Sequence, residues 1–155
     1  MSTFNFNYIF KDAFGTFKVF ETIPIEISGI LTEGHSKTIW QTLNHLIIWR
    51  THLLHKLTNI ESNTHFNESK SWSTQYKPIN RKQWNSKLNE FNLQSTEIKA
   101  AINNLNFSDL NLEEKLKLLL DSSTHLSFHL GEIILISRQK NKYPQPSEMK
   151  EFLKE

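Results

Sequence analysis

Residues 124–132 read Thr-His-Leu-Ser-Phe-His-Leu-Gly-Glu and lie within the last long apolar-periodic segment of the chain. On a helix, His125 and His129 would project from the same face, one turn apart, with about 5 to 6 Å between their Cβ atoms. Both imidazoles could then reach one ion. His45 lies inside another apolar helical pattern. If the two helices pack side by side, three neutral nitrogens converge and leave a coordination position free, as expected of catalytic zinc and related metals.

The composition limits the kinds of protein and site that are compatible with this chain. A length of 155 residues predicts a single domain, residues 1–155, with one core. The chain contains no Cys, which excludes disulfides, a Cys nucleophile and a thiolate metal site. Any metal must therefore be held by His and carboxylates. The 18 Lys and Arg against 16 acidic residues are scattered and give a net charge of +2, which does not favour nucleic acid as a partner.

The hydropathy pattern supports neither a membrane-spanning segment nor a signal peptide. The sequence has no apolar run of about 18 residues, and its start lacks the charged, apolar and small-residue regions of a secretory signal. We therefore expect a soluble cytoplasmic protein. Only four Gly and four Pro punctuate the chain, too few for a many-stranded sheet, so the sequence favours an all-α fold.

The first candidate helix covers residues 4–23, where aromatic and aliphatic residues recur at spacings of three and four. Gly15 weakens this prediction slightly. Pro24 can either kink the helix or start a short second helical turn over residues 25–31. Ser36 or Thr38 can cap the helix that follows.

The second predicted helix, residues 38–57, has so wide an apolar surface that we expect it to be central. A polar connection then covers residues 58–80. Connections of this length often line binding sites or act as lids. The simpler interpretation is that Trp72 and Tyr76 fix a crossover to the surface of the bundle.

Two further helices complete the predicted fold. Asn80 is a candidate cap for a helix over residues 80–105, and another helix should run over residues 111–140, with a short terminal helix at 147–153. The fold prediction is therefore all-α, a four-helix bundle with a long connection between helices two and three. Metal sites in such bundles are commonly built in the core from facing side chains.

Two more residues are candidates for the site. His52 shares a face with His45 but lies about 10 Å further along the axis, so it would line a pocket rather than hold the ion. Glu132 shares a face with His125 and His129, but three ligands over two turns of one helix span too far for a small ion. Glu132 would then orient a ligand or accept a proton. It could equally pair with an Arg or Lys at the helix edge. His35 and His65 fall in predicted loops and are treated as surface residues.

The segments 38–46 and 125–133, followed by Leu135-Ile136-Ser137-Arg138 and Tyr143-Pro144, resemble the DinB-like superfamily, which includes the YfiT-like bacillithiol transferases. The likeness covers essentially the whole chain, including the order of four helices. It implies a four-helix bundle with a divalent metal, nickel or zinc, held by three histidines that match His45, His125 and His129. It also implies a homodimer and no DNA-binding motif. At Glu132 many relatives have Gln.

The resemblance further implies a transferase that joins a low-molecular-weight thiol, such as bacillithiol, to a small electrophile. A metal with an open position can bind a thiol and favour its thiolate, the reactive form, without any Cys from the protein. The same ion could instead acidify a bound water and give a hydrolase. A non-catalytic metal-binding or dimerisation bundle is the alternative from another class.

Overall fold

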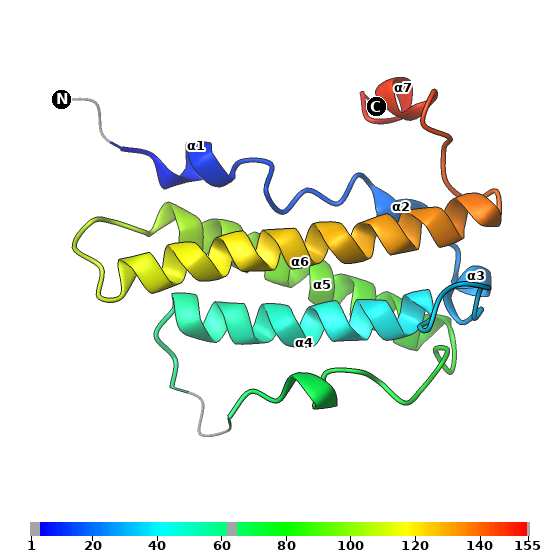
Figure 1. Cartoon of the computed structure of the whole chain (residues 1–155), viewed down its shortest axis with the longest axis horizontal. Helices are drawn as coiled ribbons and strands as arrows, with labels where there is room; N and C mark the ends of the chain where they lie inside the picture. The colour runs from blue at the N-terminus through cyan, green and yellow to red at the C-terminus, as the bar shows by residue number, and fades with distance from the viewer. Residues whose placement is uncertain (1–3, 62–64, 155) are drawn as a thin grey trace.

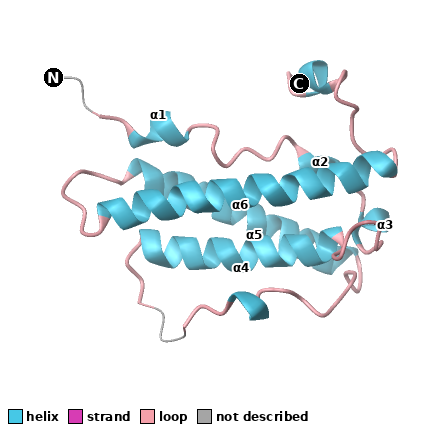
Figure 2. Cartoon of the chain, in the orientation of Figure 1, coloured by secondary structure: helices cyan, strands magenta, loops and turns pink. Residues whose placement is uncertain are grey.

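The computed structural model describes residues 4–61 and 65–154, and within these ranges every regular element is a helix (Figure 2). Three long helices lie side by side along the longest axis of the molecule (Figure 1): α4 (Ile39–Leu57), α5 (Arg81–Asn103) and α6 (Leu112–Gln139). The predicted all-helical fold is confirmed, and the three long helices begin and end within two residues of their predicted bounds.

Helix α4 is central, as its wide apolar surface predicts, because it packs against both α5 and α6. Its first turn is closed by a capping box. The Thr38 hydroxyl accepts a hydrogen bond from the Gln41 amide, and the Gln41 side chain accepts one from the Thr38 amide. These two bonds satisfy amides that the helix itself leaves unpaired. Thr38, rather than Ser36, is therefore the cap of this helix.

The prediction of one continuous helix over residues 4–23 is wrong. The structure has two short helices, α1 (Phe6–Phe10) and α2 (Val19–Thr22), and the residues between them form turns in which Phe17 and Lys18 have positive φ angles. Phe6, Phe10, Phe14, Val19, Phe20 and Ile23 still pack into the core, whereas Ile9 and Phe17 are exposed. The apolar spacing therefore indicated burial of most of these side chains and not a continuous helix. Aromatic residues and Gly also have low helix propensity. In place of four long helices, the described residues form three, covered by a segmented strap, residues 4–23.

This strap is held by the C-terminal segment of the chain. Pro24 is the N-cap of α3 (Ile25–Ser28), so it starts a short helix rather than kinking a long one. The C-terminal segment, which includes α7 (Met149–Phe152), lies beside the strap. The Tyr143 hydroxyl donates to the Phe17 carbonyl, and the Lys18 ammonium donates to the Phe152 carbonyl at 3.0 Å.

The connection between α4 and α5 runs back along α4 (Figure 1) and contains one turn of 3-10 helix, η1 (Glu68–Lys70). Residues 62–64 of this predicted connection lie outside the described residues. Two hydrogen bonds fasten its second half to the start of α4: the Thr38 hydroxyl donates to the Tyr76 carbonyl at 2.6 Å, and the Gln41 amide group donates to the Ser73 carbonyl at 2.8 Å. The connection is therefore part of the packed structure. No helix in the described part of the chain has the length and apolar character that crossing a membrane requires.

Alanine substitutions at two glycines should change the stability of this packed structure in opposite directions. A Cβ added at Gly29 would lie 2.2 Å from the Cβ of Lys77 in the connection, whereas one added at Gly131 in α6 would meet nothing within 4 Å. We expect Gly29→Ala to lower the free energy of unfolding by about 1–3 kcal/mol through overpacking. Gly131→Ala should raise it by up to about 1 kcal/mol through helix propensity. Urea unfolding of both variants checks this, and a neutral Gly29→Ala would show that the connection does not pack closely on α3.

Candidate metal centre

Three histidine nitrogens meet between α4 and α6. His45 projects from α4, while His125 and His129 project from one face of α6. The Nε2 atom of His125 lies 3.0 Å from that of His45 and 3.1 Å from that of His129. One ligand atom from each ring lies within 4.8 Å of the others. Ligands of tetrahedral zinc at 2.0–2.1 Å are about 3.3 Å apart, so the separations suit one small ion.

The tautomer of His45 is set by the connection. The Ser71 hydroxyl, which is fully buried, lies 2.7 Å from His45 Nδ1 and donates its one proton to the Glu68 carbonyl at 2.6 Å. A carbonyl can only accept, so the Ser71 oxygen accepts a hydrogen bond from the protonated Nδ1 of His45. The Nε2 atom of His45 then carries a lone pair, which is the form that binds a metal.

The tautomer of His129 is set in the same way by a carboxylate. His129 Nδ1 lies 2.7 Å from Glu132 Oε2, one turn further along α6. An ionised carboxylate accepts only, so Nδ1 carries the proton and Nε2 carries a lone pair. Glu132 contacts the side of the imidazole opposite the cluster. Glu132 is therefore in a position to orient the His129 ring. It does not face the position where a reacting group on the ion would lie.

Two fixed lone pairs thus point at the single Nε2 atom of His125. That atom can carry at most one proton, so it cannot donate a full hydrogen bond to both neighbours. At least one of the two short nitrogen–nitrogen contacts therefore has no proton along it and leaves an acceptor unsatisfied, which is unfavourable in a largely buried site. A divalent cation removes this conflict because it accepts all three lone pairs at once. The donor set therefore fits a metal: the buried three-histidine group could hold an ion.

Aromatic side chains wall the cluster on two sides. Trp72, from the connection, stacks on the His45 imidazole with ring centroids 3.8 Å apart and planes 8° from parallel. Trp49, one turn after His45 on α4, lies with its ring centroid 5.0 Å from that of His125. The stacked contact of Trp72 with His45 and the tilted contact of Trp49 with His125 restrict the orientations of these two rings. His45 and His129 are buried, whereas His125 is only partly buried, so the approach to the ion is on the His125 side.

Burial favours the neutral form of two of the three candidate ligands, His45 and His125. Burial lowers the pKa of His45 to about 3, with further lowering by positive charge on His129 and His125. Burial likewise lowers the pKa of His125 to about 4, with a second contribution from His129. A metal-binding imidazole must be deprotonated. His45 and His125 therefore stay deprotonated, and so able to bind an ion, at pH values well below neutral.

The structure brings together His45, His125, His129 and Glu132 from the sequence-predicted site. His52 lies beside the cluster rather than in it, stacked on Phe66 with ring centroids 4.4 Å apart. His65, treated from the sequence as a surface residue, is exposed but lines the same groove as His52. His35 is half-buried in a loop, where its Nδ1 donates to the Glu33 carbonyl at 3.3 Å.

Sequence reasoning missed Ser71. No periodicity marks it, because it reaches His45 from an irregular segment 26 residues further along the chain. The only sequence signal was the unusual length of the connection, which predicted lining of a site as one alternative. The contacts of Ser71 and Trp72 with His45 support the interpretation that the connection lines the site. The Tyr76 side chain is 60% exposed, and only its backbone carbonyl accepts a hydrogen bond, from Thr38.

In comparisons with known proteins, the chain matches no protein-family model, no curated protein and no solved structure.

Ser71→Ala should weaken metal binding, because the His45 tautomer loses the acceptor that fixes it. Removal of such a partner typically costs about 10–100-fold in affinity. Ser69→Ala is the matched control, since Ser69 lies in the same turn of 3-10 helix but is exposed and bonds only to Asn67. Competition with a chromophoric chelator measures both affinities. Equal affinities for the two variants would contradict the assigned role of Ser71.

The metal-free protein should lose stability as the pH falls from 6.5 toward 4. In this range the unfolded chain binds protons at positions 45 and 125, whereas the folded chain does not, because both pKa values are lowered. The free energy of unfolding is then fully retained above pH 6.5 and decreases below it, by at most about 1.4 kcal/mol per pH unit for each histidine. Urea unfolding with a chelator present measures the slope. A His45→Gln/His125→Gln variant should lose it, and an unchanged slope would contradict the assignment.

Proposed function

We propose that this chain is a divalent-metal-dependent enzyme of the DinB-like type that transfers a low-molecular-weight thiol to a small electrophile. The observation that carries the proposal is the convergence of three Nε2 atoms, two of them held as lone-pair donors by Ser71 and Glu132. Three protein ligands leave a position for a reacting group, which is the pattern of catalytic rather than structural sites.

The ion itself would supply acidity. Nickel or zinc held by three neutral imidazoles would lower the pKa of a thiol at the remaining position and so favour the thiolate. The chain has no Cys, so the sulfur must come from a small molecule.

The residues of the chain do the positioning. Ser71 and Trp72 fix the His45 ring, and Glu132 fixes the His129 ring. In the reaction, a bond forms between the thiol sulfur and a carbon of the electrophile while the bond from that carbon to its leaving group breaks. The thiol proton passes to solvent or buffer, because Glu132 contacts the face of His129 that points away from the cluster.

The resemblance to the DinB-like superfamily supports this assignment through His45, His125, His129 and the Arg138 and Tyr143-Pro144 that follow. The chain departs from the pattern at Glu132, where many relatives have Gln, and in the segmented helix at its start. A carboxylate makes the bond to His129 Nδ1 stronger than an amide would, so the departure at Glu132 is compatible with a metal ligand. A homodimer is part of the same proposal.

A conjugation assay tests the function. Cysteine or bacillithiol is mixed with 1-chloro-2,4-dinitrobenzene, and the zinc- or nickel-loaded protein should accelerate formation of the thioether and chloride. Chelation or His45→Ala should lower the rate at least about 100-fold, and adding the ion back should restore only the wild type.

His35→Ala is the matched control, because His35 lies in a loop outside the cluster and should leave the rate unchanged. Metal-loaded protein that is no faster than the free ion would contradict the transferase proposal. Release of acid from an activated ester by the same preparation would instead favour the hydrolase.

A further inference from the structure

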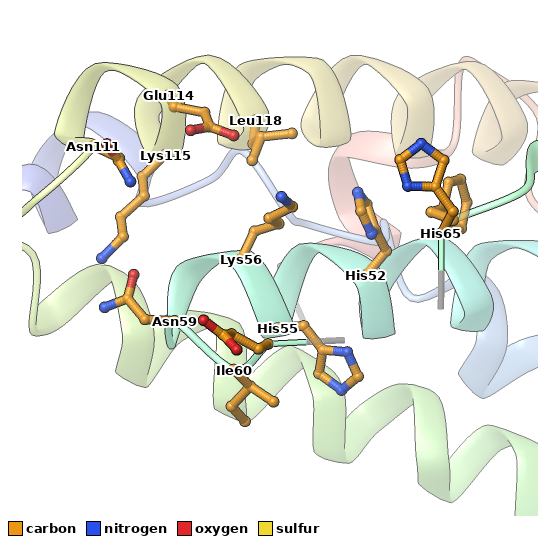
Figure 3. Close-up of a pocket in the computed structure, with 12 residues that line it drawn as sticks. His52, His55, Lys56, Asn59, Ile60, His65, Asn111, Glu114, Lys115 and Leu118 are labelled. Atoms are coloured by element: carbon orange, nitrogen blue, oxygen red, sulfur yellow. The ribbon is translucent and has the colours of Figure 1, made fainter. Parts of the chain in front are cut away.

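Helix α6 has three sides with different surroundings. One side packs into the hydrophobic core, and a second carries His125 and, nearer the start of the helix, lines a groove against α4 (Figure 3). The third side is exposed although it carries large apolar side chains: Leu120, Phe128 and Leu135 are 55%, 65% and 52% exposed. Exposed apolar side chains that recur along one face indicate an interaction surface, whereas scattered ones do not.

Small residues occupy the positions between these apolar side chains. Thr124, Ser127 and Gly131 are all exposed. Positions 120, 124, 127, 131 and 135 recur at steps of three and four residues, so they follow one face of the helix, with Phe128 at its edge. A Cβ added at Gly131 would meet nothing within 4 Å, so this position is open to a neighbour. Projecting side chains separated by small residues form a surface on which another helix can pack.

This face of α6 is complementary to itself. In an antiparallel pair of α6 helices with a two-fold axis between residues 127 and 128, two residues face each other when they lie equally far in sequence from that point. The facing pairs are then Leu120 with Leu135, Thr124 with Gly131, and Ser127 with Phe128. An apolar side chain therefore meets an apolar side chain toward each end, and near the centre each Phe ring meets small residues that leave room for it.

The charges at the two ends of α6 also suit an antiparallel pair. Glu113 and Glu114 lie in the first turn of the helix, and Arg138 lies in the last turn. The acidic first turn of each copy would lie beside the basic last turn of the other, with the helix dipoles antiparallel. Lys117 would face Arg138, but Asp121 already compensates its charge, with 2.6 Å between ammonium and carboxylate. A parallel pair would instead bring the acidic turns together.

We infer that two copies of this chain associate through this face of α6, in an antiparallel two-fold pair centred between residues 127 and 128. The inference rests on the proposed function, of which a homodimer is part, and it names the surface that forms the dimer. Phe128 links this surface to the metal centre, because its ring packs on the His129 imidazole with centroids 5.1 Å apart. Burial of Phe128 between two copies restricts a side chain that contacts a candidate ligand.

Disulfide cross-linking tests the pairing directly, because the chain contains no Cys of its own. Ser127→Cys should cross-link two copies under mild oxidation with a chelator present, since the two positions lie about 1.5 Å apart along the axis. Thr124→Cys should not, because its two copies are offset by about 10 Å along the axis, beyond the reach of a disulfide. Adding Gly131→Cys to Thr124→Cys should restore the cross-link, since these two positions face each other.

Leu93→Cys is the control for random collisions, because Leu93 is 60% exposed on α5, outside this face. Non-reducing electrophoresis reads out all four variants. No cross-link in Ser127→Cys would overturn the inference. A Thr124→Cys variant that cross-links as fully as the Thr124→Cys/Gly131→Cys pair, or as fully as Ser127→Cys, would also overturn it, because neither result fits an antiparallel pair with this centre.

Sedimentation of the metal-free protein provides a second measurement. Leu120→Glu should raise the dimer dissociation constant at least about 10-fold, because the two-fold axis buries the new carboxylate twice. Leu93→Glu, the matched control on α5, should leave the constant unchanged. Both positions are exposed in one copy of the chain, so both variants should keep the far-ultraviolet circular dichroism of the wild type.

The outcomes separate this inference from the proposed function. A dimer that Leu120→Glu weakens, in protein that transfers no thiol, supports the interface and removes only the activity. A wild type that stays monomeric, or a dimer that Leu120→Glu and Leu93→Glu weaken equally, would overturn the interface and leave the metal-dependent transferase to its own assay.

Discussion

The meeting of three Nε2 atoms between two helices is the constraint on which the rest of this structure depends. Two of the rings are held in a fixed tautomer, His45 by Ser71 and His129 by Glu132. Both lone pairs then converge on His125, which cannot satisfy them with one proton. Hydrogen bonds alone cannot satisfy all three nitrogens of this cluster, whereas a cation can accept all three lone pairs. This is the reverse of the arrangement expected for core histidines bonded to their neighbours.

Helix α4 is what makes this arrangement possible. It packs against both α5 and α6, supplies His45, and through Thr38 and Gln41 anchors the connection that carries Ser71 and Trp72. The same helix also contributes His52, His55 and Lys56 to the lining of a neighbouring groove. Fold and site therefore depend on the same two side chains: Thr38 and Gln41 close the first turn of α4 and also bind the connection that orients a candidate metal ligand.

Local patterns predicted the long helices and the three histidines, because periodicity and capping are properties of neighbouring residues. The Asn80 cap, for example, accepts from the Gln83 amide, and the spacing of His125 and His129 guarantees a shared face. The sequence could not predict Ser71, since its contact with His45 depends on which segments pack together. It also misjudged residues 4–23, where Phe10, Phe14 and Phe20 are buried without a continuous helix. The spacing of apolar residues indicates which side chains are buried, but burial alone does not determine whether the backbone is helical.

Elemental analysis of the untagged protein and its single His→Ala variants tests the central claim most directly. The account predicts about one divalent ion per chain in the wild type and almost none in His45→Ala, His125→Ala or His129→Ala, each of which removes one of three ligands. The Ser71 and Glu132 contacts would then be explained as partners of metal ligands. A folded wild-type protein without a stoichiometric ion, even after incubation with zinc or nickel, would contradict the account.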